Sequence, residues 1–234
     1  MYAILKRESG SYFRTPLGFV LIGAFFFFSG YFFITYNLYG STTNMNSLFS
    51  NLFPVVLFLV PVLTMRLFSE EKRLKIDQHL MTSPVSRKSI VLGKFIAAVS
   101  IFLIGISSTL FDALLMSLYG KPDWYAVFGN FAGLFLLGVS LIAICLFYSS
   151  LTESQVIAAV CGFVTGLFLM LLDSLALTAN NGFVRELLRA ASFSSRYTPF
   201  TMGVFDWGNV LFFVSVCGYF LCLTVAAVDK NRWI

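Results

Sequence analysis

The first part of the chain contains an uncharged stretch too long for a single membrane helix. No Lys, Arg, Asp or Glu occurs from residue 15 to residue 65. A helix needs about 20 residues to cross the hydrocarbon of a bilayer, so this stretch has room for two crossings. Residues 37–51 (NLYGSTTNMNSLFSN) are polar and rich in turn formers, and they divide it. The first span is therefore expected at about residues 17–36 and the second at about residues 52–66.

The composition of the whole chain is that of an all-α integral membrane protein. The sequence is 58% hydrophobic and 12% charged, whereas soluble domains are usually about 25% charged. Pro54 and Pro61 predict a kink or an irregular start in the second span, which neighbouring helices can tolerate. Further apolar runs bring the expected number of transmembrane helices to six, with the last four at about residues 90–118, 125–149, 155–177 and 208–228.

A strongly charged stretch at residues 66–94 (RLFSEEKRLKIDQHLMTSPVSRKSIVLGK) interrupts the apolar pattern between the second and third spans. It carries seven of the 16 Lys and Arg residues and the single histidine, His79. A charge at the bilayer centre costs about 3 kcal/mol or more, so this stretch is excluded from hydrocarbon. It must lie in water, at the membrane surface or against a partner protein.

The distribution of positive charge sets the orientation. Twelve of the Lys and Arg residues fall on the side of the N-terminus, and the other side has Lys121, Arg185, Arg189 and Arg196. The positive-inside rule then places both termini and residues 66–89 in the cytoplasm. Because topology explains the cations, the net charge of +5 does not indicate a nucleic-acid partner. The first span lacks a small-residue cleavage site before the polar stretch and is expected to be retained.

Two segments outside the spans have amphipathic patterns. Residues 1–16 mix Lys, Arg and Glu with aromatic residues, which predicts an N-terminal helix on the cytoplasmic face; the alternative is an unstructured basic terminus. Residues 178–206 form an external segment before the last span. Within it, residues 183–193 place apolar side chains opposite Arg185, Glu186 and Arg189, which predicts a surface helix.

No catalytic or metal-binding pattern is present in the sequence. One histidine cannot supply the usual nucleophile–base sets, and no HExxH motif or Walker A motif occurs. The four cysteines lie in apolar runs without CxxC spacing and are expected to be packing residues. Asp112 and Asp173 are placed by residue count near the far interface; the other interpretation is a proton or cation relay.

Two GxxxG motifs suggest close helix contacts. Gly129 and Gly133 form one pair, and Gly162 and Gly166 form the other. The spacing aligns two small residues on one helix face and lets a neighbouring helix approach. Glycine is common in membrane helices, so these four residues are packing candidates only.

The pattern resembles the ABC-2 type permeases, the membrane subunits of ATP-driven exporters, and most closely the gliding-motility and copper-site-maturation permeases of bacteria. The segments that carry the resemblance are FSEEKR at residues 68–73, TSPVS at 82–86, IVLGK at 90–94, FTMGVFD at 200–206 and NRW at 231–233. Residues 75–78 (KIDQ) depart from the Gly-Thr-hydrophobic-Glu step that family members often carry.

The resemblance implies that residues 66–89 hold a cytoplasmic coupling helix that contacts a separate ATPase subunit. Acids flanked by cations can form complementary ion pairs with such a partner, and proline should end the helix. The alternative is a plain connector held to anionic lipid by its cations. The residues that the resemblance assigns to the ATPase interface are Phe68, Glu70, Glu71, Lys72, Arg73 and Pro84.

The resemblance further implies a bacterial cytoplasmic-membrane protein that is not itself an enzyme, with ATP and Mg bound by the partner ATPase. A second copy or a paralogous permease would complete the complex. The expected function is substrate export. The alternative within the family is a mechanical or assembly complex that acts on an extracytoplasmic accessory protein. A membrane enzyme or an ion channel without an ATPase is a third class, which the missing catalytic set argues against.

Overall fold

The computed structural model describes residues 7–8, 10–13, 15–74, 87–178 and 182–230. Within these residues the regular structure is helical, as predicted, and it contains six helices long and apolar enough to cross a membrane. In chain order the elements are α2 (Pro16–Phe32), the π-helix η1 (Phe33–Leu38), α3 (Asn46–Thr64), α4 (Arg66–Arg73), α6 (Arg87–Tyr119), α7 (Trp124–Leu151), α8 (Gln155–Thr178), α9 (Gly182–Ala191), α10 (Phe193–Thr201) and α11 (Trp207–Lys230).

Helix α3 begins at Asn46, earlier than the predicted start at residue 52. The polar residues taken for a turn form its first turns because they find hydrogen-bond partners there. The side chain of Asn44 accepts a bond from the backbone N–H of Asn46, and Asn130 of α7 donates to the Asn46 side chain. Leu48 and Phe49 are buried in the same turns. The helix continues through Pro54 and Pro61, so the irregular start is not observed.

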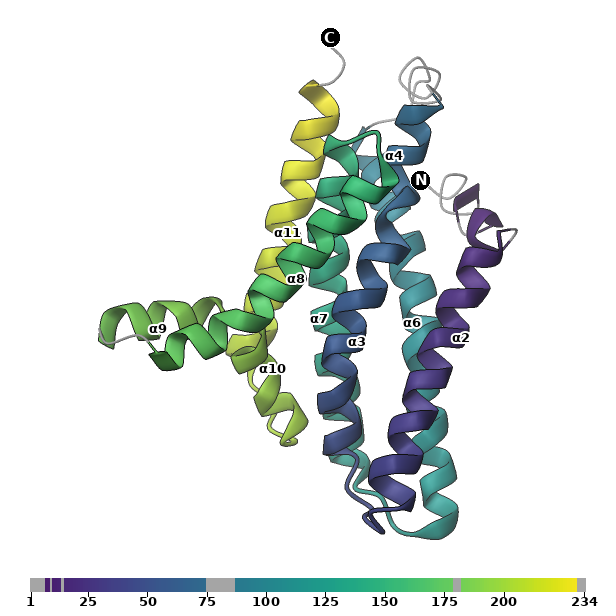
Figure 1. Ribbon diagram of the computed structural model, residues 1–234, viewed down its shortest axis with the longest axis vertical. Coiled ribbons are helices and arrows are strands. Elements are labelled where there is room, and N and C mark those ends of the chain that lie inside the picture. The colour runs from purple at the N-terminus through teal and green to yellow at the C-terminus, as the bar shows by residue number, and fades with distance from the viewer. Residues whose placement is uncertain (1–6, 9, 14, 75–86, 179–181, 231–234) are drawn as a thin grey trace.

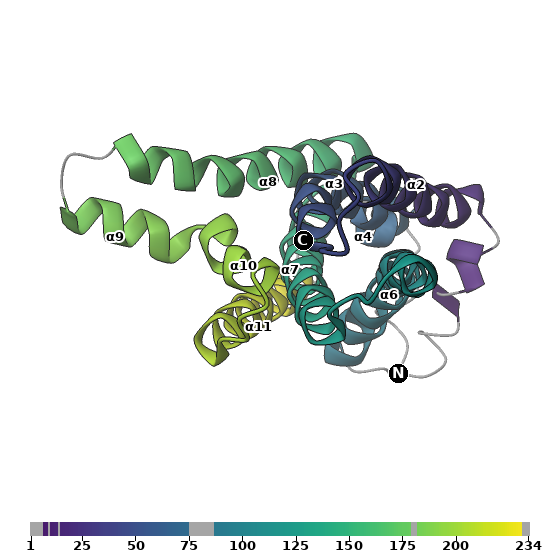
Figure 2. The ribbon, with the colours of Figure 1, turned by 90° about the horizontal axis from the view of Figure 1, so that it is seen from below.

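Helix α7 is the centre of the bundle. It packs against α3, α6 and α11 along its length, and Figure 2 shows it lying among them. Its inward residues, including Leu134, Leu137, Ile142 and Leu146, are fully or almost fully buried. Helix α2 lies on the outer side of α6 and extends as η1 toward the far end of the bundle. Helix α7 therefore contacts helices from both halves of the chain.

Helices α8 and α9 form an arm beside the bundle. Figures 1 and 2 show α8 leaning away from α3 and α9 returning alongside it. The amphipathic helix predicted at residues 183–193 corresponds to α9, although it lies beside the middle of the bundle rather than beyond its far end. Most of its described side chains are exposed.

Helix α10 was not predicted, and tertiary contacts explain why it forms. Its sequence, FSSRYTPFT, is polar and contains Pro199. The hydroxyl of Ser192 accepts a bond from the N–H of Ser195 and caps the helix. Tyr197 donates its hydroxyl to the Phe49 carbonyl at 2.9 Å, and its ring stacks on Phe53. Helix α10 is thereby anchored to α3.

Candidate functional site at the α4 junction

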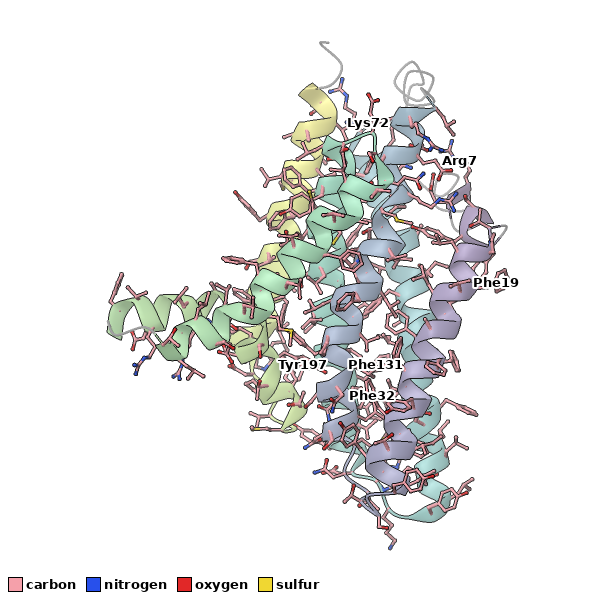
Figure 3. The ribbon with its side chains drawn as sticks, viewed as in Figure 1. Arg7, Phe19, Phe32, Lys72, Phe131 and Tyr197 are labelled. Carbon is pink, nitrogen blue, oxygen red and sulfur yellow. The ribbon has the colours of Figure 1, made fainter. Side chains whose placement is uncertain are left out.

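The predicted coupling helix is α4, and three other parts of the chain hold it in place. These are residues 7–8 and 10–13, the early part of α6 and the end of α7, and together with α4 they are here named the α4 junction. Figure 3 shows Arg7 and Lys72 at this end of the bundle. Only Met65 separates α4 from α3, so α4 directly continues a membrane span.

Lys94 of α6 is the central residue of the junction. Its side chain is 1% exposed, and its ammonium lies 2.8 Å from a carboxylate oxygen of Glu71 and 3.3 Å from one of Glu8. It also donates a hydrogen bond to the Leu67 carbonyl at 2.6 Å and lies over the Phe68 ring. A buried ammonium is tolerable only with such compensation. Lys94 thus connects α6 to both α4 and the N-terminal segment.

Arg7 completes a neutral group of four charges. Its guanidinium pairs with Glu8 at 3.0 Å and with Glu71. Two cations therefore face two carboxylates, with Lys94 buried and Arg7 half-exposed. The exposed pairs contribute little by themselves because water screens them. The buried Lys94 pairs matter most, since removing one partner leaves a charge without compensation.

The N-terminal segment also docks through Tyr12. Residues 7–8 and 10–13 are helical, as predicted for an amphipathic helix. The Tyr12 hydroxyl donates to the Leu63 carbonyl at 2.8 Å, close to the end of α3. Burial raises the pKa of Tyr12, so the phenol stays neutral and remains a donor.

Helix α7 reaches α4 through its last residues. The hydroxyl oxygen of Ser149 accepts bonds from the N–H groups of Phe68 and Ser69 at 3.1 and 3.3 Å, and it lies 3.2 Å from the Met65 carbonyl. Helix α4 has no side-chain cap of its own, so a distant serine takes that role. Lys72 donates to the Ser150 carbonyl.

The residues predicted to form the ATPase interface differ from one another in burial and in their partners. Phe68 and Glu71 face inward onto Lys94. Glu70 forms a two-bond ion pair with Arg66 along α4, and Arg73 is exposed. Their contact with an ATPase stays a prediction. Pro84 and His79 lie outside the described residues.

Sequence reasoning missed three residues of the junction: Glu8, Lys94 as a buried partner, and Ser149. Glu8 and Ser149 are far from α4 in the chain, and no local spacing relates them to it. Lys94 did carry a signal, because it is a lone charge several residues inside an apolar helix. A lone charge in that position needs a buried partner.

The four candidate packing glycines differ in how closely neighbouring residues approach them. A Cβ on Gly133 would lie 2.5 Å from the Cβ of Phe200, and one on Gly162 would lie 2.9 Å from the Cβ of Pro61. These two glycines make close contacts of the expected kind. A Cβ on Gly166 would meet Leu57 at ordinary distance, and one on Gly129 would meet nothing within 4 Å.

Asp112 and Asp173 do not form a shared site. Asp112 is buried and accepts a hydrogen bond from Ser29 of α2, whereas Asp173 is partly exposed on α8. Figure 2 shows α3 and α7 between α6 and α8. Among the described residues no group of three or more His, Cys, Asp or Glu side chains could hold a metal ion.

Comparison with protein families matches residues 18–228 to the family described as ABC-2 family transporter protein. The match begins in α2 and ends in α11, so it includes all six candidate spans and α4. No curated protein matches the chain.

Proposed function

The chain belongs to the ABC-2 family of transporter proteins, and on that premise we propose that it is the membrane-spanning permease subunit of a bacterial ATP-driven exporter. Separate ATPase subunits bind ATP and Mg and dock on the cytoplasmic end of α4. The permease works with a second copy of itself or with a paralogous permease in the cytoplasmic membrane, with both termini inside the cell.

The observation that carries the proposal is the attachment of α4 to the rest of the fold. Helix α4 continues α3, binds α6 through Lys94 and binds α7 through Ser149. A force applied to α4 would therefore move three spans together, and the N-terminal segment would follow through Glu8. Such rigid-body movement is a standard way to convert a local binding event into a global change.

The surroundings of the residues on α4 support a narrower proposal for the ATPase contact. Glu71 is 13% exposed and is engaged within the chain, so it positions α4. Arg73 and Leu74 are exposed at the end of α4, and in this proposal they contribute to the contact surface for the ATPase. Complementary charge there sets the orientation and rate of docking more than its strength.

The first test is copurification with a Walker-type ATPase encoded beside the gene. The parent chain should retain the ATPase through gel filtration, and Arg73→Glu should reduce the retained amount several-fold at low salt. The control is Arg189→Glu, an exposed charge reversal on α9 that should have no effect. If no ATPase copurifies with the parent, the proposal fails.

The second test separates export from the mechanical alternative. Proteoliposomes containing the permease and its ATPase are supplied with ATP and candidate substrates. ATP-dependent movement of a substrate supports export. ATP turnover that changes the protease sensitivity of residues 178–206 without moving any solute supports a complex that acts on an extracytoplasmic accessory protein.

A further inference from the structure

The arm formed by α8 and α9 is fastened to the bundle by Arg196 of α10. The Arg196 guanidinium donates hydrogen bonds to the Ala190 carbonyl of α9 at 3.4 Å and to the Asn209 side chain of α11 at 3.1 Å. It also lies over the Phe212 ring, 5.2 Å from the ring centroid. Asn209 is 3% exposed, so Arg196 is tied to a buried residue of a membrane span. The C-terminal end of α9 is therefore held at a fixed level on α11.

The contacts with α11 also give the depth of α9 in the membrane. The ring of Phe193, directly after α9, packs edge-on against Phe213 at 5.4 Å between centroids. Helix α11 is about 36 Å long at 1.5 Å per residue, and Phe213 lies about 9 Å from Trp207, at the end away from the α4 junction. Trp207 and Asp229 suit the two interfaces, so a hydrocarbon layer of about 30 Å is centred on α11. The end of α9 then lies about 6 Å inside the hydrocarbon.

Helix α9 stays near this depth along its length and is charged there. Figures 1 and 2 both show it lying across the long axis of the bundle rather than along it. Arg185, Glu186 and Arg189 are exposed on it. The Arg189 side chain has no hydrogen-bond or ion-pair partner among the described residues. The surface that α9 presents to the bilayer therefore carries guanidinium groups below the level of the headgroups.

Phosphate is the group in a membrane that best complements this surface. A charged side chain at hydrocarbon depth is tolerated when water and headgroups are drawn down to it. Residues 182–201 contain Arg185, Arg189 and Arg196 but only one acid, Glu186, so they attract anions. A guanidinium can bind phosphate through two parallel hydrogen bonds. Exposed Phe183 on the same helix suits contact with acyl chains.

We propose that α9 binds the phosphates of anionic phospholipids and draws the headgroups of the leaflet opposite the α4 junction down to its own level. Arg185 and Arg189 bind the phosphates, and Arg196 keeps α9 at this depth. The bilayer is consequently thinner beside the arm than elsewhere around the bundle. This inference requires the membrane-spanning fold, and it is independent of an ATPase partner and of export.

The test is photochemical crosslinking of the full-length protein in vesicles of phosphatidylcholine and phosphatidylglycerol. One phosphatidylglycerol probe carries the photoreactive group in its headgroup and another carries it in the middle of an acyl chain. Labelled peptides are mapped by mass spectrometry. In the parent, the headgroup probe should label residues 182–191 several-fold more than the chain probe does.

Single substitutions show whether the charge on α9 is responsible. Arg189→Gln should reduce headgroup labelling of residues 182–191 about fivefold, the effect expected for one cation at a membrane surface. Arg189→Lys should retain most of it. Lys121→Gln is the matched control, since it removes an exposed cation in the turn between α6 and α7, away from the arm, and should leave this labelling unchanged.

The double variant Arg185→Leu/Arg189→Leu should reverse the ratio of the two probes, because an α9 without cations would be surrounded by acyl chains at this depth. Labelling of the parent mainly by the chain probe, or unchanged labelling in Arg189→Gln, would overturn the proposal. Glycerol phosphate at matched concentration should leave the labelling unchanged, and its loss would reject the lipid as the source of the phosphate. Absence of labelling by both probes in the parent would mean that a protein surface covers α9, which also overturns the proposal.

Discussion

Lys94 and Glu71 form an ion pair across 2.8 Å at the point where a membrane helix meets the predicted coupling helix. The lysine is buried, so the pair is weakly screened by salt and has no water to replace a missing partner. The carboxylate of Glu71 also receives Arg7, which brings the N-terminal segment to the same place. The pair therefore joins α6 to α4 and to the N-terminal segment, and it leads to the first prediction.

Replacing Lys94 by methionine should destabilise the protein by about 3 kcal/mol or more, because Glu8 and Glu71 lose their buried counter-ion. The measurement is unfolding of the purified protein in detergent. Lys88→Met, an exposed change on the same helix, should stay within about 0.5 kcal/mol of the parent. Equal unfolding midpoints for the two variants would show that the ion pairs of Lys94 do not stabilise the fold.

Ser149→Ala should loosen α4 from α7. The N–H groups of Phe68 and Ser69 lose their shared acceptor, at a cost of about 1–3 kcal/mol. Hydrogen exchange of residues 65–73 should become faster, and ATP-driven coupling should fall while ATPase binding persists. Ser117→Ala is the matched control, since that exposed hydroxyl bonds only within its own helix. Unchanged exchange in Ser149→Ala would argue against its capping role.

Gly133→Ala and Gly129→Ala should differ although they lie one helical turn apart on α7. A methyl group at Gly133 overlaps Phe200, and overpacking of this kind costs about 1–3 kcal/mol. A methyl group at Gly129 meets open space, so this variant should unfold at or slightly above the parent temperature. Similar thermal shifts for both would mean that α10 is not seated on α7 as described.

Tyr197→Phe should weaken the attachment of α10 to α3 by about 1 kcal/mol. The substitution keeps the ring on Phe53 but removes the hydrogen bond to the Phe49 carbonyl. Limited proteolysis within residues 178–206 should become faster, with a small decrease in thermal stability. Tyr219→Phe is the control, because that tyrosine is exposed on α11. Equal cleavage rates would contradict the anchoring role.

Much of the fold could be predicted because a bilayer leaves few choices. Long uncharged runs must be helices that satisfy their own backbone, and the charged stretch at residues 66–94 must lie outside the hydrocarbon. The ends of the spans were harder to predict. The polar sequence around Asn46 predicts a turn, but Asn46 begins a helix in which its side chain accepts a hydrogen bond from Asn130 of another helix.

The candidate site, like the fold, could be predicted from the sequence only in part. The sequence predicts a coupling segment where charge and the family pattern coincide at residues 68–73, and the structure shows a helix there, while its contact with an ATPase stays a prediction. It could not show that Glu70 and Glu71 have different surroundings, one on the surface with Arg66 and one beneath it with Lys94. Adjacent helical residues point in different directions, and which direction is buried depends on what packs there.

The sequence by itself determined the class of the protein, its six spans and the charged segment between the second and third, since these follow from local hydropathy and helix length. The tertiary structure decided that Lys94, Glu8 and Ser149 hold α4, that α10 folds at all, and that Asn130 pairs with Asn46. Those features depend on side chains distant in the chain. A buried charge or amide becomes stable only when the folded chain brings its partner within hydrogen-bond distance.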